Sequence, residues 1–236
     1  SKVCSDYVNE IMISDEGYRL FFNGLKYYYE KNIPRAVRLY EKAVNLGNSY
    51  AMNNLADLIE NGEGVEKDIN QAIELYEKAV NLGNSNAMNN LAICYNIGIG
   101  FEKDINKAIY LYEKAVNLDN SNAMNNLADC YKNGEGVEKD INHAIELWEK
   151  AITLDSNNKI FYENIENLIR EYPSQYIVYC QLKYDKIKTK YQILETNYKT
   201  LENKYQEIRD NLVDYAPGTD KVQELEDEFY RNADKL

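Results

Sequence analysis

The sequence has few of the residues on which most enzymes and metal sites depend. Its 236 residues include one histidine, three prolines, four cysteines and one tryptophan. Without a second histidine, a nucleophile beside a base, or ligands at metal spacing, no hydrolytic or zinc site can be assembled. His143 occupies a position that holds Gln71 and Lys107 in the corresponding segments, which indicates a variable surface site. We therefore expect no catalytic residue, no cofactor and no metal.

Long apolar runs are also missing. No stretch is long enough to span a membrane or to serve as a signal peptide. Cys94 and Cys130 occupy equivalent positions of neighbouring segments, and a disulfide between them would need Cα atoms within about 7 Å. Stacked segments do not normally bring equivalent residues that close. We expect buried free thiols and a cytoplasmic protein that has no membrane partner.

Basic residues are outnumbered. The chain has 27 lysines and arginines against 39 acidic residues, a net charge of −12. Residues 49–156 alone hold 18 acidic residues against 8 lysines. Because phosphate binding needs a basic stripe, a nucleic-acid partner is not expected. The charge instead favours a protein or extended peptide with basic residues.

What the sequence does contain is an internal repeat. The stretch AMNNLADLIENGEGVEKDINQAIELYEKAVNLGNSN, residues 51–86, recurs almost verbatim from Ala87 and again from Ala123, a period of 36 residues. A fixed period of this size indicates a solenoid whose units must stack to bury their apolar faces. Within one unit, apolar residues at helical spacing predict two amphipathic helices, around 51–59 and 69–80. Each unit is therefore a helical hairpin.

Capping residues mark the ends of the predicted helices. Side-chain oxygens at the N-cap accept hydrogen bonds from the free amides of the first turn. The predicted caps of the first helices are Ser49, Ser85 and Ser121, and those of the second helices are Asp68, Asp104 and Asp140. Gly47 and Gly83 follow the second helix, where a left-handed residue can end it, and Asp119 takes that place in the third unit. The N-G-E-G-V loop lacks the Lys-Ser/Thr ending of a phosphate-binding loop, so its glycines are interpreted as turn residues.

The repeated segment NNLADLIENGEGVEKDINQAIELYEKAV resembles the Sel-1-like repeat, a relative of the tetratricopeptide repeat. The G-x-G-V loop, the aspartate before the second helix and the A-x-x-x-Y-x-K-A spacing occur together. Residues 15–48 resemble a tetratricopeptide unit without the loop insertion, with Pro34 in the first turn of its second helix. The resemblance implies a right-handed solenoid and an adaptor role in assembling protein complexes.

The predicted fold class is all-α: a right-handed α-solenoid of stacked helical hairpins, followed by a long C-terminal heptad helix. The expected segments are an N-terminal segment (1–14), a tetratricopeptide-like repeat (15–48), three Sel-1-like repeats (49–84, 85–120 and 121–156), a capping helix (157–172), a coiled-coil helix (173–215) and an acidic tail that could hold a short helix (216–236).

A pair of asparagines recurs on the first helix of each Sel-1-like unit. In tetratricopeptide-like solenoids the corresponding positions line a concave groove, and carboxamides can hydrogen-bond to an extended peptide backbone. Two alternatives stay open: recent duplication alone explains the recurrence, or one asparagine of each pair ties neighbouring hairpins together. The candidate groove residues are Asn53, Asn54, Asp57, Glu60, Asn89, Asn90, Ile93, Asn96, Asn125, Asn126, Asp129 and Lys132.

A heptad pattern follows the repeats from Ile177 to Tyr215, with tyrosine mostly at a and isoleucine or leucine mostly at d. It predicts either a coiled coil between chains or a long helix that folds back on the solenoid or the tail. The charges at e and g do not decide between parallel and antiparallel pairing. The candidate oligomer seam comprises Tyr184, Ile187, Tyr191, Leu194, Tyr198, Leu201, Tyr205 and Ile208.

These observations favour a non-enzymatic interaction scaffold or adaptor that binds a partner segment in the groove of the repeats, with a homo-oligomer as a further option through the C-terminal helix. The alternative is a host-directed effector or viral interaction factor, which would use the same binding physics. An enzyme of the cysteine-rich-repeat β-lactamase type is disfavoured, because the cysteine pair that such relatives carry in each unit is missing.

Overall fold

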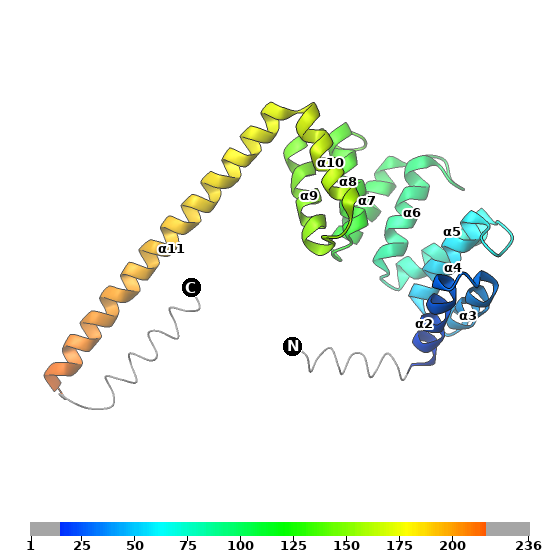
Figure 1. The fold of residues 1–236 in the computed structure, drawn as a ribbon, viewed down its shortest axis with the longest axis horizontal. Helices are drawn as coiled ribbons and strands as arrows, with labels where there is room; N and C mark the ends of the chain where they lie inside the picture. Colours follow the sequence, from blue (N-terminus) through cyan, green and yellow to red (C-terminus); the bar gives the residue numbers. More distant parts are fainter. Residues whose placement is uncertain (1–14, 216–236) are drawn as a thin grey trace. The chain divides into compact units, whose positions relative to one another are not determined.

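The computed structural model describes residues 15–215, and the side chains of residues 15–207. The expected N-terminal segment and acidic tail lie outside these residues. Four helical hairpins follow one another along the chain (Figure 1). They are α2 (Glu16–Tyr29) with α3 (Ile33–Asn45), α4 (Ser49–Asn61) with α5 (Ile69–Asn81), α6 (Ser85–Ile97) with α7 (Ile105–Val116), and α8 (Ser121–Asn133) with α9 (Ile141–Leu154).

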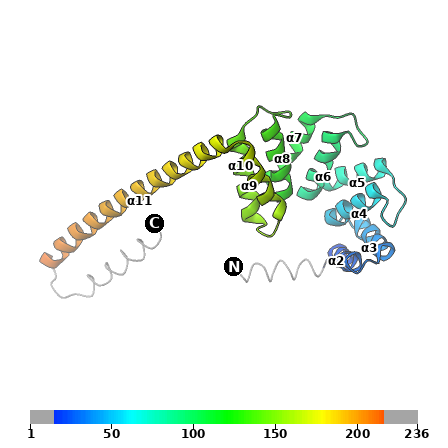
Figure 2. The same cartoon turned by 45° about the horizontal axis from the view of Figure 1, so that its top comes forward.

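The hairpins stack in sequence order, as Figure 2 shows, because the second helix of each packs against the first helix of the next. Helix α10 (Lys159–Glu171) packs against α9 and covers the last hairpin. The described residues up to Glu171 form one compact unit, and α11 (Pro173–Tyr215) belongs to a second unit that begins at Tyr172. The predicted all-α solenoid and the long C-terminal helix are confirmed.

One aromatic side chain from each second helix fills the core of its hairpin. These residues, at equivalent repeat positions, are Tyr40, Tyr76, Tyr112 and Trp148, and each is at most 1% exposed. The first helix accommodates the ring with a small residue: a Cβ atom on Gly24 would lie 2.6 Å from the Tyr40 ring. Alanine is fully buried at the equivalent position of the later units, at Ala56, Ala92 and Ala128. This pairing of a large and a small residue sets how closely the two helices approach.

The predicted N-caps of the first helices are wrong by one residue. Asn48, Asn84 and Asn120 cap these helices, and Ser49 is already helical. The Asn48 Oδ1 atom accepts a hydrogen bond from the Ala51 amide at 2.9 Å. Asparagine is favoured at the N-cap because its Nδ2 group also contacts the previous hairpin: Asn84 donates to the Ser49 hydroxyl at 3.4 Å. The predicted aspartate caps of the second helices are confirmed.

The two loop glycines have different functions. The first, Gly98 in the second loop, ends α6 in a left-handed conformation. The second, Gly100, also has a positive φ of 69°, and it lies against the preceding hairpin. A Cβ atom there would lie 2.3 Å from Ile73 Cδ1 and 2.7 Å from Ile69 Cγ2. The loop is therefore part of the contact between repeats, a function beyond the predicted turn.

We expect Gly100→Ala to destabilise the array by roughly 2–4 kcal/mol, because it combines left-handed strain with overpacking against α5. Gly83→Ala is the matched control, since Gly83 has a φ of 79° but nothing within 4 Å of the added Cβ. It should cost only about 1–2 kcal/mol. Urea unfolding of both variants measures the difference, and equal losses would mean that the loop makes no stabilising contact with the preceding repeat.

Candidate protein-binding groove

The recurrent asparagines form a ladder of side-chain hydrogen bonds between hairpins. Asn90 Nδ2 donates to Asn53 Oδ1 at 3.1 Å, and Asn126 Nδ2 donates to Asn89 Oδ1 at 2.8 Å. Within the first two pairs the bonding continues in the same direction: Asn53 Nδ2 donates to Asn54 Oδ1 at 3.2 Å, and Asn89 Nδ2 donates to Asn90 Oδ1 at 3.3 Å. The ladder starts at the Tyr40 hydroxyl, which accepts from Asn54 Nδ2 at 3.4 Å. A single polar chain thus connects all four hairpins.

Burial separates the two members of each pair. Asn53 and Asn89 are only 7% and 6% exposed, so these two candidate groove residues are not open to solvent. They point between neighbouring first helices, where an unpaired amide would be costly. Asn54, Asn90 and Asn126 are half-buried. The structure therefore shows the ties between hairpins that were the open alternative, and peptide binding by these residues stays a prediction.

The fourth unit ends the ladder differently. The Asn125 Oδ1 atom accepts hydrogen bonds from Trp148 Nε1 at 3.0 Å and from Asn164 Nδ2 of α10 at 2.7 Å. Lys132 pairs with Glu171 of the same helix at 3.2 Å. Two candidate groove residues are therefore engaged by α10, which leaves the free part of the groove nearer the first hairpin.

The acidic candidates lie on the exposed side of this ladder. Asp57 is exposed, but its carboxyl group is partly desolvated by neighbouring groups, and this desolvation raises its pKa. The negative charge of Glu63 raises the pKa further. Burial likewise raises the pKa of Asp129, while the charge of Lys132 opposes the rise. Neither aspartate forms an ion pair with any residue from 15 to 207. Both carboxylates would consequently gain from a cation supplied by a partner.

The remaining candidates occupy the middle of the array. The Glu60 carboxylate accepts a hydrogen bond from the buried Tyr76 hydroxyl at 3.0 Å. At the equivalent position of the next unit, the Oδ1 atom of Asn96 is buried without a hydrogen-bond partner. Ile93 is half-buried beside it. We use the name groove face for the surface formed by Asn54, Asp57, Glu60, Asn90, Ile93, Asn96, Asn126 and Asp129.

A pocket at the first end of the groove face was not predicted. Its volume is about 170 Å³, and it opens between α2, α3 and α4. The structure brings two predicted residues, Asn54 and Asp57, together with residues that sequence reasoning missed. These are Leu25, Tyr28, Tyr29, Tyr40 and Leu58. The run of three tyrosines at the end of the first helix was the signal that could have revealed it.

The seam residues of α11 are largely exposed. Tyr184 is 60% exposed, Ile187 59% and Tyr191 70%. Leu194 and Tyr198 are about two-fifths exposed, Leu201 and Tyr205 are half-buried, and the Ile208 side chain lies outside the described residues. An apolar face of this length on one helix is unusual for a surface that meets only water.

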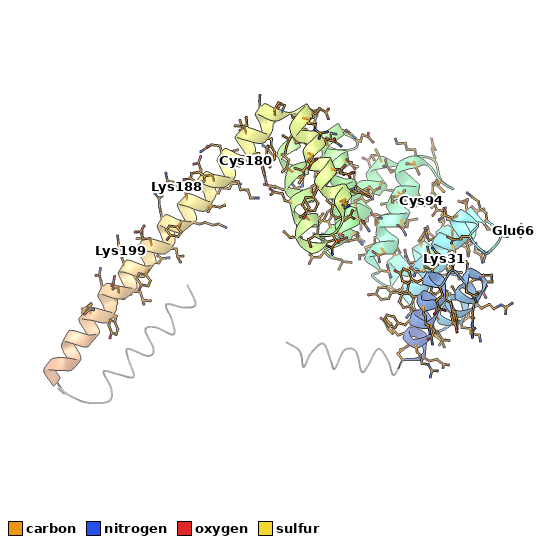
Figure 3. The ribbon with its side chains drawn as sticks, viewed as in Figure 1. Lys31, Glu66, Cys94, Cys180, Lys188 and Lys199 are labelled. Atoms are coloured by element: carbon orange, nitrogen blue, oxygen red, sulfur yellow. The ribbon has the colours of Figure 1, made fainter. Side chains whose placement is uncertain are left out.

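Two cysteines of the array are buried, and Cys180 is exposed. Cys94 lies on α6 within the array and Cys180 on α11 (Figure 3). Cys94 and Cys130 are buried free thiols, and burial raises their pKa values to about 12 and about 11. Such thiols are poor nucleophiles at neutral pH.

Among the described residues, no group of three or more histidine, cysteine, aspartate or glutamate side chains could hold a metal ion. No helix within residues 15–215 combines the length and apolar character needed to cross a membrane.

Comparison with known proteins gives one family match. A family model described as the Sel1 repeat matches residues 17–48, 49–84, 85–120 and 121–156, which is more than half of the chain. No match is found among curated proteins.

Two solved structures show the same fold. A Sel1 repeat protein from Oxalobacter formigenes is 26% identical, with a TM-score of 0.56, and the match covers 59% of this chain and 57% of that one. The protein c5321, a protective antigen of uropathogenic Escherichia coli, is 24% identical with a TM-score of 0.58, covering 70% of this chain and 36% of that one. This chain therefore spans about half or less of the length of these two proteins.

Proposed function

We propose that this chain, which belongs to the Sel1 repeat family, is a non-enzymatic scaffold that binds an extended segment of a partner protein along its groove face. Repeats of this family generally serve protein interaction. The stacked first helices present one continuous row of amide, carboxylate and apolar groups. Asn54 and Asn90 each use one donor and one acceptor within the ladder, Asn126 uses one donor, and a carboxamide has two of each. Asn54, Asn90 and Asn126 thus keep capacity for a peptide backbone.

The observation that carries the proposal is the unpaired negative charge of this face. Asp57 and Asp129 have raised pKa values because they are partly desolvated, and no cation within the described residues pairs with them. A partner segment with lysine or arginine side chains would relieve this charge. Electrostatic complementarity of this kind supplies specificity and speeds association.

A peptide selection tests the proposal. Random peptides displayed against the intact chain should yield binders enriched in lysine and arginine. Ile93→Arg places a bulky cation in the middle of the groove face and should weaken the best binder by at least about tenfold, a loss of about 1.4 kcal/mol. Isothermal titration calorimetry measures the affinity.

The matched control is Tyr110→Arg, which adds the same side chain at a 56% exposed position on α7, outside the groove face. It should leave the affinity unchanged. Selected peptides without basic residues, or equal losses in the two variants, would contradict binding along the groove face.

The exposed seam of α11 supports a second part of the proposal, namely self-association through a coiled coil. Seam residues at a and d, such as Tyr191 and Ile187, lie on one stripe of the helix and are more than half exposed. Burying them against a second copy would remove their apolar surface from water. An assembly with several identical groove faces would also bind a repetitive partner with greater avidity.

We expect the double variant Leu194→Asp and Leu201→Asp to convert an oligomer into a monomer, because charges at d positions oppose the seam. Thr189→Asp with Thr196→Asp is the control, since these residues lie on the opposite stripe of α11. Light scattering reports the mass and circular dichroism the helicity. A wild-type chain that is monomeric at high micromolar concentration would show that the seam is used within one chain.

A further inference from the structure

The pocket between α2, α3 and α4 differs from the rest of the groove face in its aromatic lining. The first hairpin has no asparagine pair, and its first helix instead presents Leu25, Tyr28 and Tyr29 toward the groove. Leu58 of α4 completes the apolar lining. The Tyr28 and Tyr29 rings meet edge to face with centroids 5.8 Å apart. Such a lining suits an aliphatic or aromatic group more than a peptide backbone.

One carboxylate accompanies these rings. Asp57 contributes to the same pocket and accepts a hydrogen bond at Oδ1 from Asn61 Nδ2 at 3.2 Å. Asn61 also donates to the Asp57 backbone oxygen at 2.9 Å, and Asp57 Oδ2 has no hydrogen-bond donor among the described residues. Glu63 adds further negative charge, and it raises the pKa of Tyr28 more than any other cause does. The pocket is therefore both aromatic and negatively charged.

One of these two rings already lies near an ammonium group. The Lys31 Nζ atom lies 5.9 Å from the centroid of the Tyr28 ring, a distance at which cation–π attraction operates. Lys31 does not appear among the residues that line the pocket, and it forms no ion pair with Asp57. No lysine or arginine of the described residues therefore lines the pocket.

We propose that this pocket holds one cationic side chain, lysine or arginine, of the segment that binds along the groove face. The aliphatic stem would lie against Leu25 and Leu58, and the charged end would meet Asp57 and the tyrosine rings. The volume of about 170 Å³ is well below the 300–1,000 Å³ typical of small-molecule sites, so it suits a single side chain. This inference rests on the proposed function, and it adds the chemical class that one subsite selects.

A pair of short probes tests the pocket. Acetyl-Gly-Lys-Gly-amide and its norleucine counterpart have stems of similar length, but only the first carries a charge. Titrated into the isotope-labelled full chain, the lysine probe should shift the amide signals of Tyr28, Tyr29 and Asp57. The norleucine probe should bind at least about fivefold more weakly, as expected when cation–π and charge attraction are lost.

Asp57→Asn should weaken the lysine probe by at least about threefold, because the amide keeps the shape and removes the charge. The fold should survive, since burial already disfavours the charged form of Asp57. Asp185→Asn is the control: it makes the same change at an exposed position of α11, outside the groove face, and it should leave binding unchanged. Tyr29→Leu should also weaken the probe, and Tyr29 is 72% exposed, so its loss should not unfold the array.

Equal binding of the two probes, no binding of the lysine probe, or an unchanged affinity in Asp57→Asn would overturn the pocket. These results are separable from the proposed function. Peptides that are blocked by Ile93→Arg but tolerate Asp57→Asn would leave the groove in place without the pocket. A lysine probe that binds normally to a chain that selects no peptides would show the reverse.

Discussion

The carboxamide ladder is the constraint on which the arrangement of the repeats depends. Apolar burial drives the hairpins together, but it is not directional. The bond from Asn126 to Asn89 at 2.8 Å and that from Asn90 to Asn53 at 3.1 Å form in only one relative position of adjacent hairpins. A slip would leave buried amides unpaired, at a cost of about 1–3 kcal/mol each. The ladder therefore fixes the register of the array.

Register in turn sets what the groove face can do. The ladder holds Asn54 and Asp57 at fixed positions beside the tyrosines of the first hairpin, so the pocket needs no rearrangement to form. Pre-organised groups lose less entropy on binding than mobile ones. At the other end, α10 engages Asn125 and Lys132, so the available groove face ends at Asn126 and Asp129. Structure and binding thus use opposite sides of the same asparagine pairs.

Much of this fold follows from the sequence, because the 36-residue period and the apolar spacing determine helices and stacking. The sequence could not predict that Asn48 caps the helix in place of Ser49, since both residue types cap helices well. Whether Asn53 faces solvent or hydrogen-bonds to Asn90 depends on the separation of neighbouring helices. The residue spacing within one repeat does not determine this separation. The sequence did not predict the pocket, because Tyr28 and Tyr29 lie in the divergent first hairpin, where alignment with the repeats gives no guide to their positions.

A double-mutant cycle on the ladder tests this account most directly. Asn89→Ala, Asn126→Ala and the double variant are unfolded in urea, and the coupling free energy is taken from the four stabilities. The ladder predicts a coupling of about 0.5–1.5 kcal/mol. The same cycle on Asn53 and Asn126, which lie two hairpins apart and share no hydrogen bond, should be additive within about 0.5 kcal/mol. Additivity for Asn89 and Asn126 as well would contradict the claim that their hydrogen bond fixes the register of the repeats.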